Sequence, residues 1–287
     1  MHVPVMLPEA LEYLAPRADG TYIDVTLGLG GHTGAIALRL ASGKLLALDR
    51  DAESMELAKQ NLAGQDVNRI EFRHARFSEL ASVAPAAGFA GVDGLLADLG
   101  VSRYQLTTPE RGFSFMAAGD VDMRMDRSQG RTAGEIVNTV DERTLANLIF
   151  EYAEERRSRQ IARAIVRARP IRDTAHLSAV IEGAVARTGP IHPATRTFMA
   201  LRLAVNEELE ELDSLLQTAP ALVRAGGRIV IITFMSLEDR KVKHSFQELA
   251  RQGRARILTK HVVRPSEQEV RTNAPSRSAK LRAVEML

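Results

Sequence analysis

The sequence of 287 residues contains no cysteine, and this absence excludes several kinds of chemistry. Without thiols, the chain has no disulfide, no thiolate zinc site and no cysteine nucleophile. The absence also fits a reducing, cytoplasmic setting, which is the location we expect. No metal site is expected, because the histidines lack ligand spacing and the segment 120–126 lacks the glycine and terminal glutamate of a calcium loop.

Long apolar runs are absent as well, since no stretch approaches the ~20 apolar residues that cross a bilayer. The first twenty residues carry Glu9, Glu12 and Pro16 rather than a basic start and an apolar run, so no secretion signal is expected. With 45% hydrophobic residues and periodic segments along most of its length, the sequence predicts a globular protein with a sizeable core and no membrane partner.

Lysine is scarce, because only six of the 38 basic residues are lysines and arginine supplies the rest. The net charge of +2 conceals a local imbalance: the stretch from Arg156 to Arg202 holds ten arginines against two acids, Asp173 and Glu182. Guanidinium groups bind phosphate with paired donors, so this stretch is a candidate for contact with nucleic acid. A solvated helix face is the ordinary alternative for such a pattern.

Segments rich in β-branched and apolar residues predict the strands of one sheet. They are residues 21–27, 43–51, 69–75, 91–100, 226–234, 256–263 and 279–287. Helices predicted from the periodicity at 33–42 and 52–63 lie between the first three of these strands. Strands that alternate with helices at this spacing form βαβ units, so we predict an α/β protein with a parallel sheet covered by helices on both faces.

The middle of the chain contains no convincing strand and predicts a helical insertion into this sheet. Its helical patterns cover residues 134–152, 154–169, 173–187 and 195–217. The expected organisation is a discontinuous α/β domain, residues 1–106 and 207–287, and an inserted, mainly helical domain, residues 107–206. Arg159, Arg163 and Arg167 follow one another at intervals of four and predict a single stripe along a helix.

A glycine cluster in DVTLGLGGHTGAI, residues 24–36, follows the first predicted strand. Ligands of parallel sheets bind beyond the carboxyl ends of the strands, where a glycine turn lets the backbone approach closely. Asp49 ends the second strand about 20 residues after Gly28, the spacing of a carboxylate that binds ribose hydroxyls. Thr33 replaces the third glycine of the dinucleotide fingerprint, and no basic residue lies within 22–38. This favours S-adenosylmethionine, which has no phosphate, over a nicotinamide cofactor.

The segment LLADLGVSRYQL, residues 95–106, ends the fourth predicted strand in an acid and a tight turn. The amino nitrogen of a nucleobase is a weak nucleophile because its lone pair is delocalised into the ring. Acceptors aimed at the amino protons localise this pair and align it with a sulfonium methyl group. Asp98 and the backbone of Leu99 and Gly100 are therefore candidate catalytic groups, with a helix cap as the alternative role of Asp98.

Several stretches in chain order resemble the bacterial 16S ribosomal RNA cytosine-N4 methyltransferases, the RsmH or MraW family. They are HVPVMLPEAL, GLGGHT, LDRD, RFSEL, DLGVS with QL, ERGFSF, DMRMD, RQIARAIV, HPATRTF, RLAVNEELEEL, FMSLEDR and SRSAKLR. The resemblance extends over essentially the whole chain. It implies a class I, Rossmann-like methyltransferase sheet with an inserted helical subdomain, S-adenosyl-L-methionine as cofactor, and a cytosine of the decoding centre in the small ribosomal subunit as target. The oligomeric state stays open, a homodimer included.

The resemblance also implies roles for individual residues. The implied cofactor contacts are Gly30, Gly31, His32, Asp49, Phe77, Asp98 and Gln105. Without the family, Phe77 and His32 would be interpreted as structural. Candidate RNA contacts are Arg111, Arg159, Arg163, Arg167 and Arg196, with Phe113, Phe115 and Phe198 as rings that could stack on an unpaired base.

The sequence departs from the family pattern at three places. Met235 replaces the usual histidine of FHSLEDR, Arg103 replaces a serine, and NAPSRS replaces NPRSRS. Alternatives to rRNA methylation are a DNA amino-methyltransferase, which could use the same pocket, and a non-catalytic ribosome assembly factor that binds the cofactor as a structural ligand. A nicotinamide oxidoreductase is a third alternative, against which the missing glycine argues.

Overall fold

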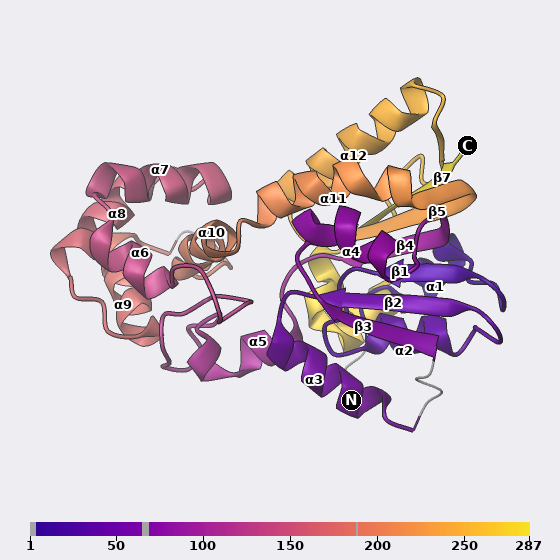
Figure 1. Ribbon diagram of the computed structural model, residues 1–287. Helices are drawn as coiled ribbons and strands as arrows, with labels where there is room; N and C mark the ends of the chain where they lie inside the picture. The colour runs from indigo at the N-terminus through magenta and orange to yellow at the C-terminus, as the bar shows by residue number, and fades with distance from the viewer. Residues whose placement is uncertain (1–3, 65–68, 188) are drawn as a thin grey trace. The chain divides into compact units, whose positions relative to one another are not determined.

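The computed structural model describes residues 4–64, 69–187 and 189–287. Residue contacts divide the chain into two compact units (Figure 1). The first unit consists of Met1–Val101 and Leu209–Leu287, and the second of Ser102–Glu208. In the described part of the chain, no helix has the length and apolar character that crossing a bilayer requires.

The first unit is built on a sheet with the strand order β3-β2-β1-β4-β5-β7-β6. Its strands are β1 (Thr21–Asp24), β2 (Lys44–Asp49), β3 (Ile70–His74), β4 (Val92–Asp98), β5 (Val223–Thr233), β6 (Ala255–Ile257) and β7 (Lys280–Met286). Each segment predicted as a strand overlaps one, although β5 and β6 begin before the predicted segments, and the predicted α/β class is confirmed. The sheet is mixed rather than wholly parallel, however, because β7 runs antiparallel to both β5 and β6.

Both faces of this sheet are buried, because alternate strand residues point to opposite sides. In β2, Leu46 and Leu48 enter one core, whereas Leu45 and Ala47 enter the other. The first core is completed by α4 (Leu80–Ala86), α11 (Glu208–Leu222) and α12 (Ser236–Arg251). The second is completed by α1 (Leu7–Leu14), α2 (Gly31–Ala37) and α3 (Ala52–Leu62) (Figure 1). Burial on both faces explains why the strands are nearly continuous apolar runs.

The second unit is helical, and none of its described residues lies in a strand. Its helices are α5 (Arg103–Thr107), α6 (Ala133–Thr139), α7 (Glu142–Ala153), α8 (Ser158–Arg167), α9 (Thr174–Ala184) and α10 (Ala194–Asn206). On α8, Ile161 and Ile165 are fully buried, while Arg159, Arg163 and Arg167 are exposed. The arginine stripe predicted from the four-residue spacing is therefore present on one helix face.

Two long helices expected from the sequence are each divided. The helix predicted over 134–152 separates into α6 and α7, and Asp141 caps the second by accepting a hydrogen bond from the Thr144 amide at 3.0 Å. The prediction of one continuous helix over 195–217 is wrong, because Glu207 adopts a left-handed φ of 50° that separates α10 from α11. The apolar period continues across both breaks, so periodicity alone does not show them.

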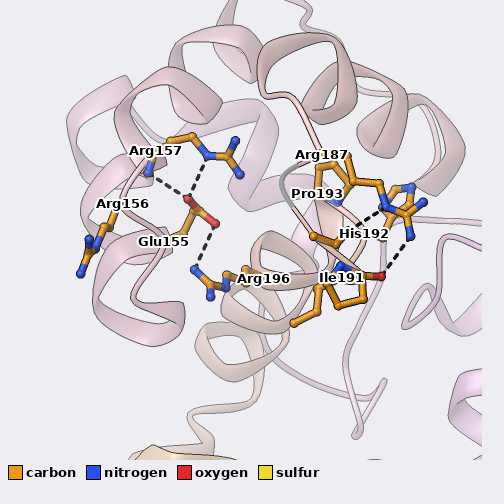
Figure 2. Close-up of a pocket in the computed structure, with 10 residues that line it drawn as sticks. Glu155, Arg156, Arg157, Arg187, Ile191, His192, Pro193 and Arg196 are labelled. Atoms are coloured by element: carbon orange, nitrogen blue, oxygen red, sulfur yellow. Dashed lines mark hydrogen bonds and ion pairs between the residues drawn. The ribbon is translucent and has the colours of Figure 1, made fainter.

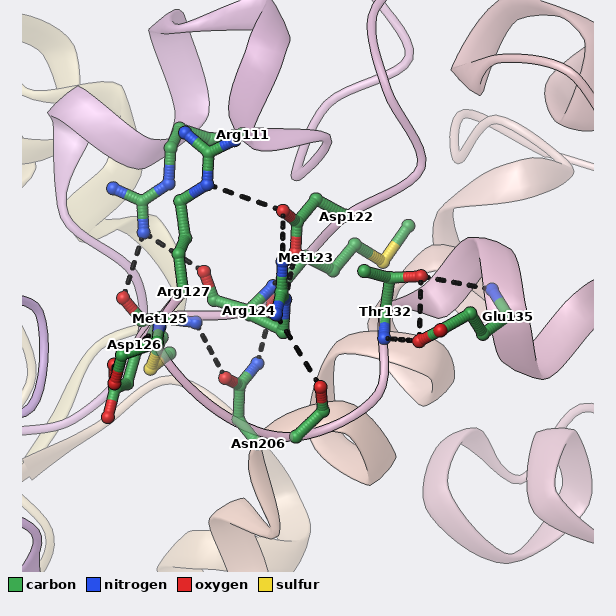
Figure 3. A network of polar contacts seen from close by, with 12 residues as sticks. Arg111, Asp122, Met123, Arg124, Met125, Asp126, Arg127, Thr132, Glu135 and Asn206 are labelled. Carbon is green, nitrogen blue, oxygen red and sulfur yellow. Dashed lines mark hydrogen bonds and ion pairs between the residues drawn. The ribbon is translucent and has the colours of Figure 1, made fainter.

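Two buried polar side chains organise the long loop between α5 and α6 (Figure 3). Arg111 is 1% exposed, and its Nη2 donates to the carbonyl oxygens of Arg124 and Met125, both at 3.0 Å. Asn206, also 1% exposed, accepts from the Met125 amide at 2.8 Å and donates to the Met123 carbonyl at 2.7 Å. These side chains satisfy backbone groups that no secondary structure pairs.

Replacing Asn206 with alanine should destabilise the second unit, because the Met125 amide and the Met123 carbonyl would stay buried without partners. Each such group costs about 1–3 kcal/mol, so the expected loss in unfolding free energy for the two groups is about 2–6 kcal/mol. Urea unfolding of the full chain measures it. The control is Gln217→Ala at an exposed position of α11. Equal unfolding midpoints for the two variants would contradict the role assigned to Asn206.

Candidate active site

Three adjacent strands of the first unit each end in an aspartate. Asp24 is the last residue of β1, Asp49 of β2 and Asp98 of β4. Because β1 pairs in parallel with both β2 and β4, the three carboxylates lie at the same edge of the sheet. This edge, at the carboxyl ends of the strands, is where open α/β sheets bind their ligands.

Asp49 joins the glycine loop to the turn after β2. Its two carboxylate oxygens accept hydrogen bonds from the backbone amides of Gly28, at 2.7 Å, and Asp51, at 2.9 Å. Burial raises the pKa of Asp49 to about 6, and the neighbouring charges of Asp51 and Asp24 act in the same direction. A carboxylate has about four acceptor positions, so the ionised group can still accept hydrogen bonds from two ligand hydroxyls.

The glycine loop places backbone close to this edge where a side chain would not fit. Gly30 precedes α2 with a φ of 88°, a left-handed conformation that disfavours side chains. At Gly31, a Cβ atom would lie 2.4 Å from the Pro4 side chain. The loop therefore requires glycine at both positions predicted for cofactor contact, and its close packing leaves its amide groups near the strand ends.

Asp24 is a member of the site that the sequence interpretation missed. It is fully buried and accepts hydrogen bonds from the Thr33 hydroxyl at 2.6 Å and the Thr26 amide at 3.0 Å. The Thr26 hydroxyl in turn accepts from the Asp98 amide at 2.7 Å. Burial raises the pKa of Asp24. Asp24 thus connects the glycine loop to the end of β4, and its place as the last residue of β1 was the available signal.

Asp98 presents an oxygen without a protein partner. Its Oδ1 is buried and makes no hydrogen bond to any described residue. On the other side, Oδ2 lies 3.6 Å from Nδ1 of His32. The Nε2 atom of His32 lies 3.1 Å from the Val5 carbonyl, which can only accept, so Nε2 carries a proton and donates. His32 is therefore fixed in an orientation that presents Nδ1 to Asp98.

The surroundings of Asp98 are acidic. Burial raises the pKa of Asp98 well above its usual range, and the negative charges of Asp24, Glu238 and Glu269 raise it further. Glu238 is anchored by accepting from the amides of Phe234 and Met235, both at 3.1 Å. A buried carboxylate among other acids is stabilised by a cation, so the arrangement suits a positively charged ligand.

The departure at Met235 leaves this anchoring intact. The contact to Glu238 uses the backbone amide of Met235, which any residue other than proline supplies. Loss of the family's histidine side chain therefore does not remove the carboxylate of Glu238 from the neighbourhood of Asp98.

The remaining cofactor candidates lie in different places. Phe77 follows β3, is half-buried and packs against the core, so one part of its ring stays accessible. Gln105 belongs to the second unit, where it is buried and its Oε1 accepts from the Ser102 amide at 2.9 Å as part of the α5 cap. The Leu99 amide donates a hydrogen bond to the Ile232 carbonyl at 2.9 Å, and Gly100 adopts a φ of 114°.

The arginines predicted to contact RNA differ in exposure. Arg159 and Arg167 are exposed, and Arg163 is exposed but lies 3.3 Å from Glu142. Arg196 is half-exposed and lies 3.5 Å from Glu155. Arg111, in contrast, is buried and donates to backbone carbonyls, so its guanidinium is not available to a phosphate.

The rings predicted to stack on a base are mostly within the protein. Phe113 and Phe198 are 8% and 4% exposed. Phe115 is half-buried, stacks on His192 with 4.5 Å between ring centroids, and meets Phe198 edge-on at 5.0 Å. Packing, rather than an open stacking platform, accounts for these contacts.

Comparison with known proteins shows the family to which this chain belongs. The model of the MraW methylase family matches residues 1–287. The chain is 58% identical over 286 residues to ribosomal RNA small subunit methyltransferase H of Solibacter usitatus, with 100% of both chains covered. It is 48% identical over 293 residues to the protein of the same name from Acidobacterium capsulatum, with 99% of this chain and 98% of that protein covered.

A solved structure extends the comparison to the fold alone. The crystal structure of PH0851 superposes with a TM-score of 0.51 at 14% sequence identity and covers 99% of this chain and 46% of that chain.

Proposed function

Because the chain belongs to the MraW methylase family, we propose that it methylates the N4 amino group of a cytosine in the decoding centre of 16S ribosomal RNA, using S-adenosyl-L-methionine. The relatives at 58% and 48% identity are small-subunit rRNA methyltransferases over their full length. The observation that carries the chemistry is the buried, unpartnered Oδ1 of Asp98 at the sheet edge that Asp49 shares.

The residues at this edge fit the cofactor. The ionised carboxylate of Asp49 accepts hydrogen bonds from the ribose hydroxyls, while the glycine loop that Asp49 anchors through Gly28 lies against the same molecule. Asp24, Glu238 and Glu269 surround Asp98 with negative charge, which stabilises a sulfonium. When bound, S-adenosyl-L-methionine supplies an electrophilic methyl group.

Asp98 is the group that acts on the target amine. Its Oδ1 accepts a hydrogen bond from the cytosine amino group, which localises the nitrogen lone pair and directs it at the methyl group. The N–C bond would form as the bond between the methyl carbon and sulfur breaks, with S-adenosylhomocysteine as the leaving group. The amino group would lose a proton, and the raised pKa of the Asp98 carboxylate makes it a competent acceptor. Nδ1 of His32, whose ring is held by the Val5 carbonyl, lies 3.6 Å from Oδ2 of Asp98, beyond hydrogen-bond distance.

The exposed arginines of the second unit supply the contact to RNA. Arg159 and Arg167 extend from α8 without a neighbouring acid among their described contacts, and Arg163 and Arg196 each share one acid. Guanidinium groups in such positions bind the phosphates of a polynucleotide. The target cytosine leaves its base stack to reach Asp98, since an enzyme cannot act on an amino group within a stacked duplex.

The alternatives considered from the sequence are not favoured. A DNA amino-methyltransferase or a nicotinamide oxidoreductase disagrees with the family and with relatives that act on small-subunit rRNA. A non-catalytic assembly factor disagrees with relatives that are named as methyltransferases.

Asp49→Asn should weaken S-adenosylhomocysteine binding about 10- to 100-fold, because hydrogen bonds to a charged acceptor contribute about 1.5–3 kcal/mol. In the native protein, affinity should also fall as the pH drops through about 6, since protonation of Asp49 removes the charged acceptor. Calorimetry between pH 5 and 8, a range chosen to bracket that value, measures both effects. An unchanged pH profile in the variant would argue against Asp49 as the ribose ligand.

Asp98→Asn should reduce methylation at least about 100-fold while the thermal unfolding midpoint stays near that of the native protein, because the amide is isosteric but a poor proton acceptor. Mass spectrometry of 16S rRNA provides the readout: a strain without the gene should lack the cytosine methyl group, the native gene should restore it, and the variant should not. Restoration by the variant would refute the role of Asp98. An unchanged methyl group in the deletion strain would refute the proposed function.

A further inference from the structure

The helical unit contains a pocket of 490 Å³ that is separate from the strand-end site. Its walls come from the α7–α8 turn, the segment between α9 and α10, and the first turn of α10 (Figure 2). The described residues that line it are Glu155, Arg156, Arg157, Arg187, Gly189, Pro190, Ile191, His192, Pro193 and Arg196. Small-molecule sites typically occupy about 300–1,000 Å³, so this pocket has room for more than a simple anion.

The pocket is strongly positive. Four arginines and one glutamate line it, which leaves an excess of three positive charges among the described lining residues. The ring of His192 does not change this balance, because its Nε2 pairs with Glu182 and its Nδ1 accepts from the Ala194 amide at 3.2 Å. A polar cavity with this charge favours an anionic ligand.

Glu155 aligns two of the arginines rather than neutralising the pocket. Its side chain is 6% exposed, and its two oxygens face Arg157 and Arg196 from different elements, each at 3.5 Å (Figure 2). Oε1 also accepts from the Arg157 amide at 2.9 Å. Each guanidinium has five N–H donors, so both keep donors for a ligand after pairing with one carboxylate.

Backbone carbonyls also orient the guanidinium groups of Arg157 and Arg187. Arg187 donates from Nε to Gly189 at 3.1 Å and from Nη2 to Pro190 at 3.0 Å. Arg157 donates from Nη1 to Ala186 at 2.8 Å. Guanidinium groups fixed in advance lose less conformational entropy when they bind, which distinguishes this pocket from the mobile side chains of a solvated arginine face.

The pocket also has an apolar wall. Pro190, Ile191 and Pro193 lie among the arginines, and Ile191 is 57% exposed although it is a large aliphatic residue. Phosphate accounts for the arginines but not for this wall or for the volume. A nucleotide accounts for all three, since its phosphate matches guanidinium forks and its sugar and base offer apolar surface.

We propose that this pocket binds one nucleotide of the RNA substrate, with its phosphate among the guanidinium groups that line the pocket and its base or ribose against Ile191. The proposal rests on the proposed function, because it takes RNA as the substrate. The pocket is a second anchoring point on the RNA, distinct from the exposed stripe on α8. Glu155 is a positioning residue that fixes the guanidinium groups of Arg157 and Arg196.

The test compares two double variants of the full-length protein with the same change in charge. Arg156→Gln with Arg187→Gln removes pocket guanidiniums without breaking the ion pairs of Glu155. Arg131→Gln with Arg143→Gln, at exposed positions of the same unit outside the pocket and outside the stretch from Arg156 to Arg202, is the control. The measurements are KM and kcat for methylation of 16S rRNA in small subunits, and the salt dependence of binding to that RNA.

The pocket variant should raise KM for the RNA about tenfold or more, with kcat nearly unchanged. The magnitude of the slope of log K against the logarithm of the salt concentration, where K is the binding constant for the RNA, should fall by about 1–2. The control should change KM less than about threefold. Both variants should bind S-adenosylhomocysteine as the native protein does, which establishes that they are folded. As a second probe, Glu155→Gln should raise KM as well, because Arg157 and Arg196 lose their alignment.

Equal effects of the two double variants would overturn the proposal that the pocket binds a nucleotide, because diffuse electrostatic attraction to the RNA would then explain both. An unchanged KM in the pocket variant would overturn it as well. Neither result touches the proposed function, which fails only if the native protein does not methylate small-subunit RNA.

Discussion

The site depends on one constraint: carboxylates end three neighbouring strands, and Asp24 is fully buried between the half-buried Asp49 and Asp98. Asp24 makes this arrangement rigid, because it binds the Thr33 hydroxyl and the Thr26 amide while the Thr26 hydroxyl accepts from Asp98. The loop and the end of β4 therefore move as one body. Burial of like charges is unfavourable, as the raised pKa values of Asp49 and Asp98 indicate, and a cationic ligand relieves it. The charges of the site therefore suit a sulfonium.

The sheet could be predicted from the sequence because both of its faces are buried. Residues such as Leu45 and Leu46 enter opposite cores, so several strands are nearly continuous apolar runs and are distinct from the helices between them. The antiparallel direction of β7 could not be predicted, since an apolar run carries no sign of its direction. The breaks between helices were also hidden, because Glu207 adopts a left-handed φ without the glycine that usually marks one.

The candidate site could be predicted only in part, and residue type explains the difference. Asp49 and Asp98 follow apolar strands that make an acid conspicuous. Asp24 also ends an apolar strand, but it is directly followed by the glycine cluster, which is the stronger signal in that segment. Arg111 shows the opposite case. An arginine beside aromatic residues suggests contact with RNA, yet its guanidinium donates to the backbone carbonyls of residues 13 and 14 positions later in the chain. Local sequence does not reveal such a partner.

Charge is divided between the two units in a way that suits the two ligands of the reaction. The strand-end site gathers Asp24, Asp98, Glu238 and Glu269, whereas the helical unit presents exposed arginines and a pocket with an excess of three positive charges. A phosphate would be repelled by the acids and attracted by the arginines. A cytosine base carries no charge, so it can approach Asp98 without the repulsion that a phosphate would meet. The same electrostatics that stabilises the sulfonium therefore selects the base, rather than the phosphates next to it, for entry.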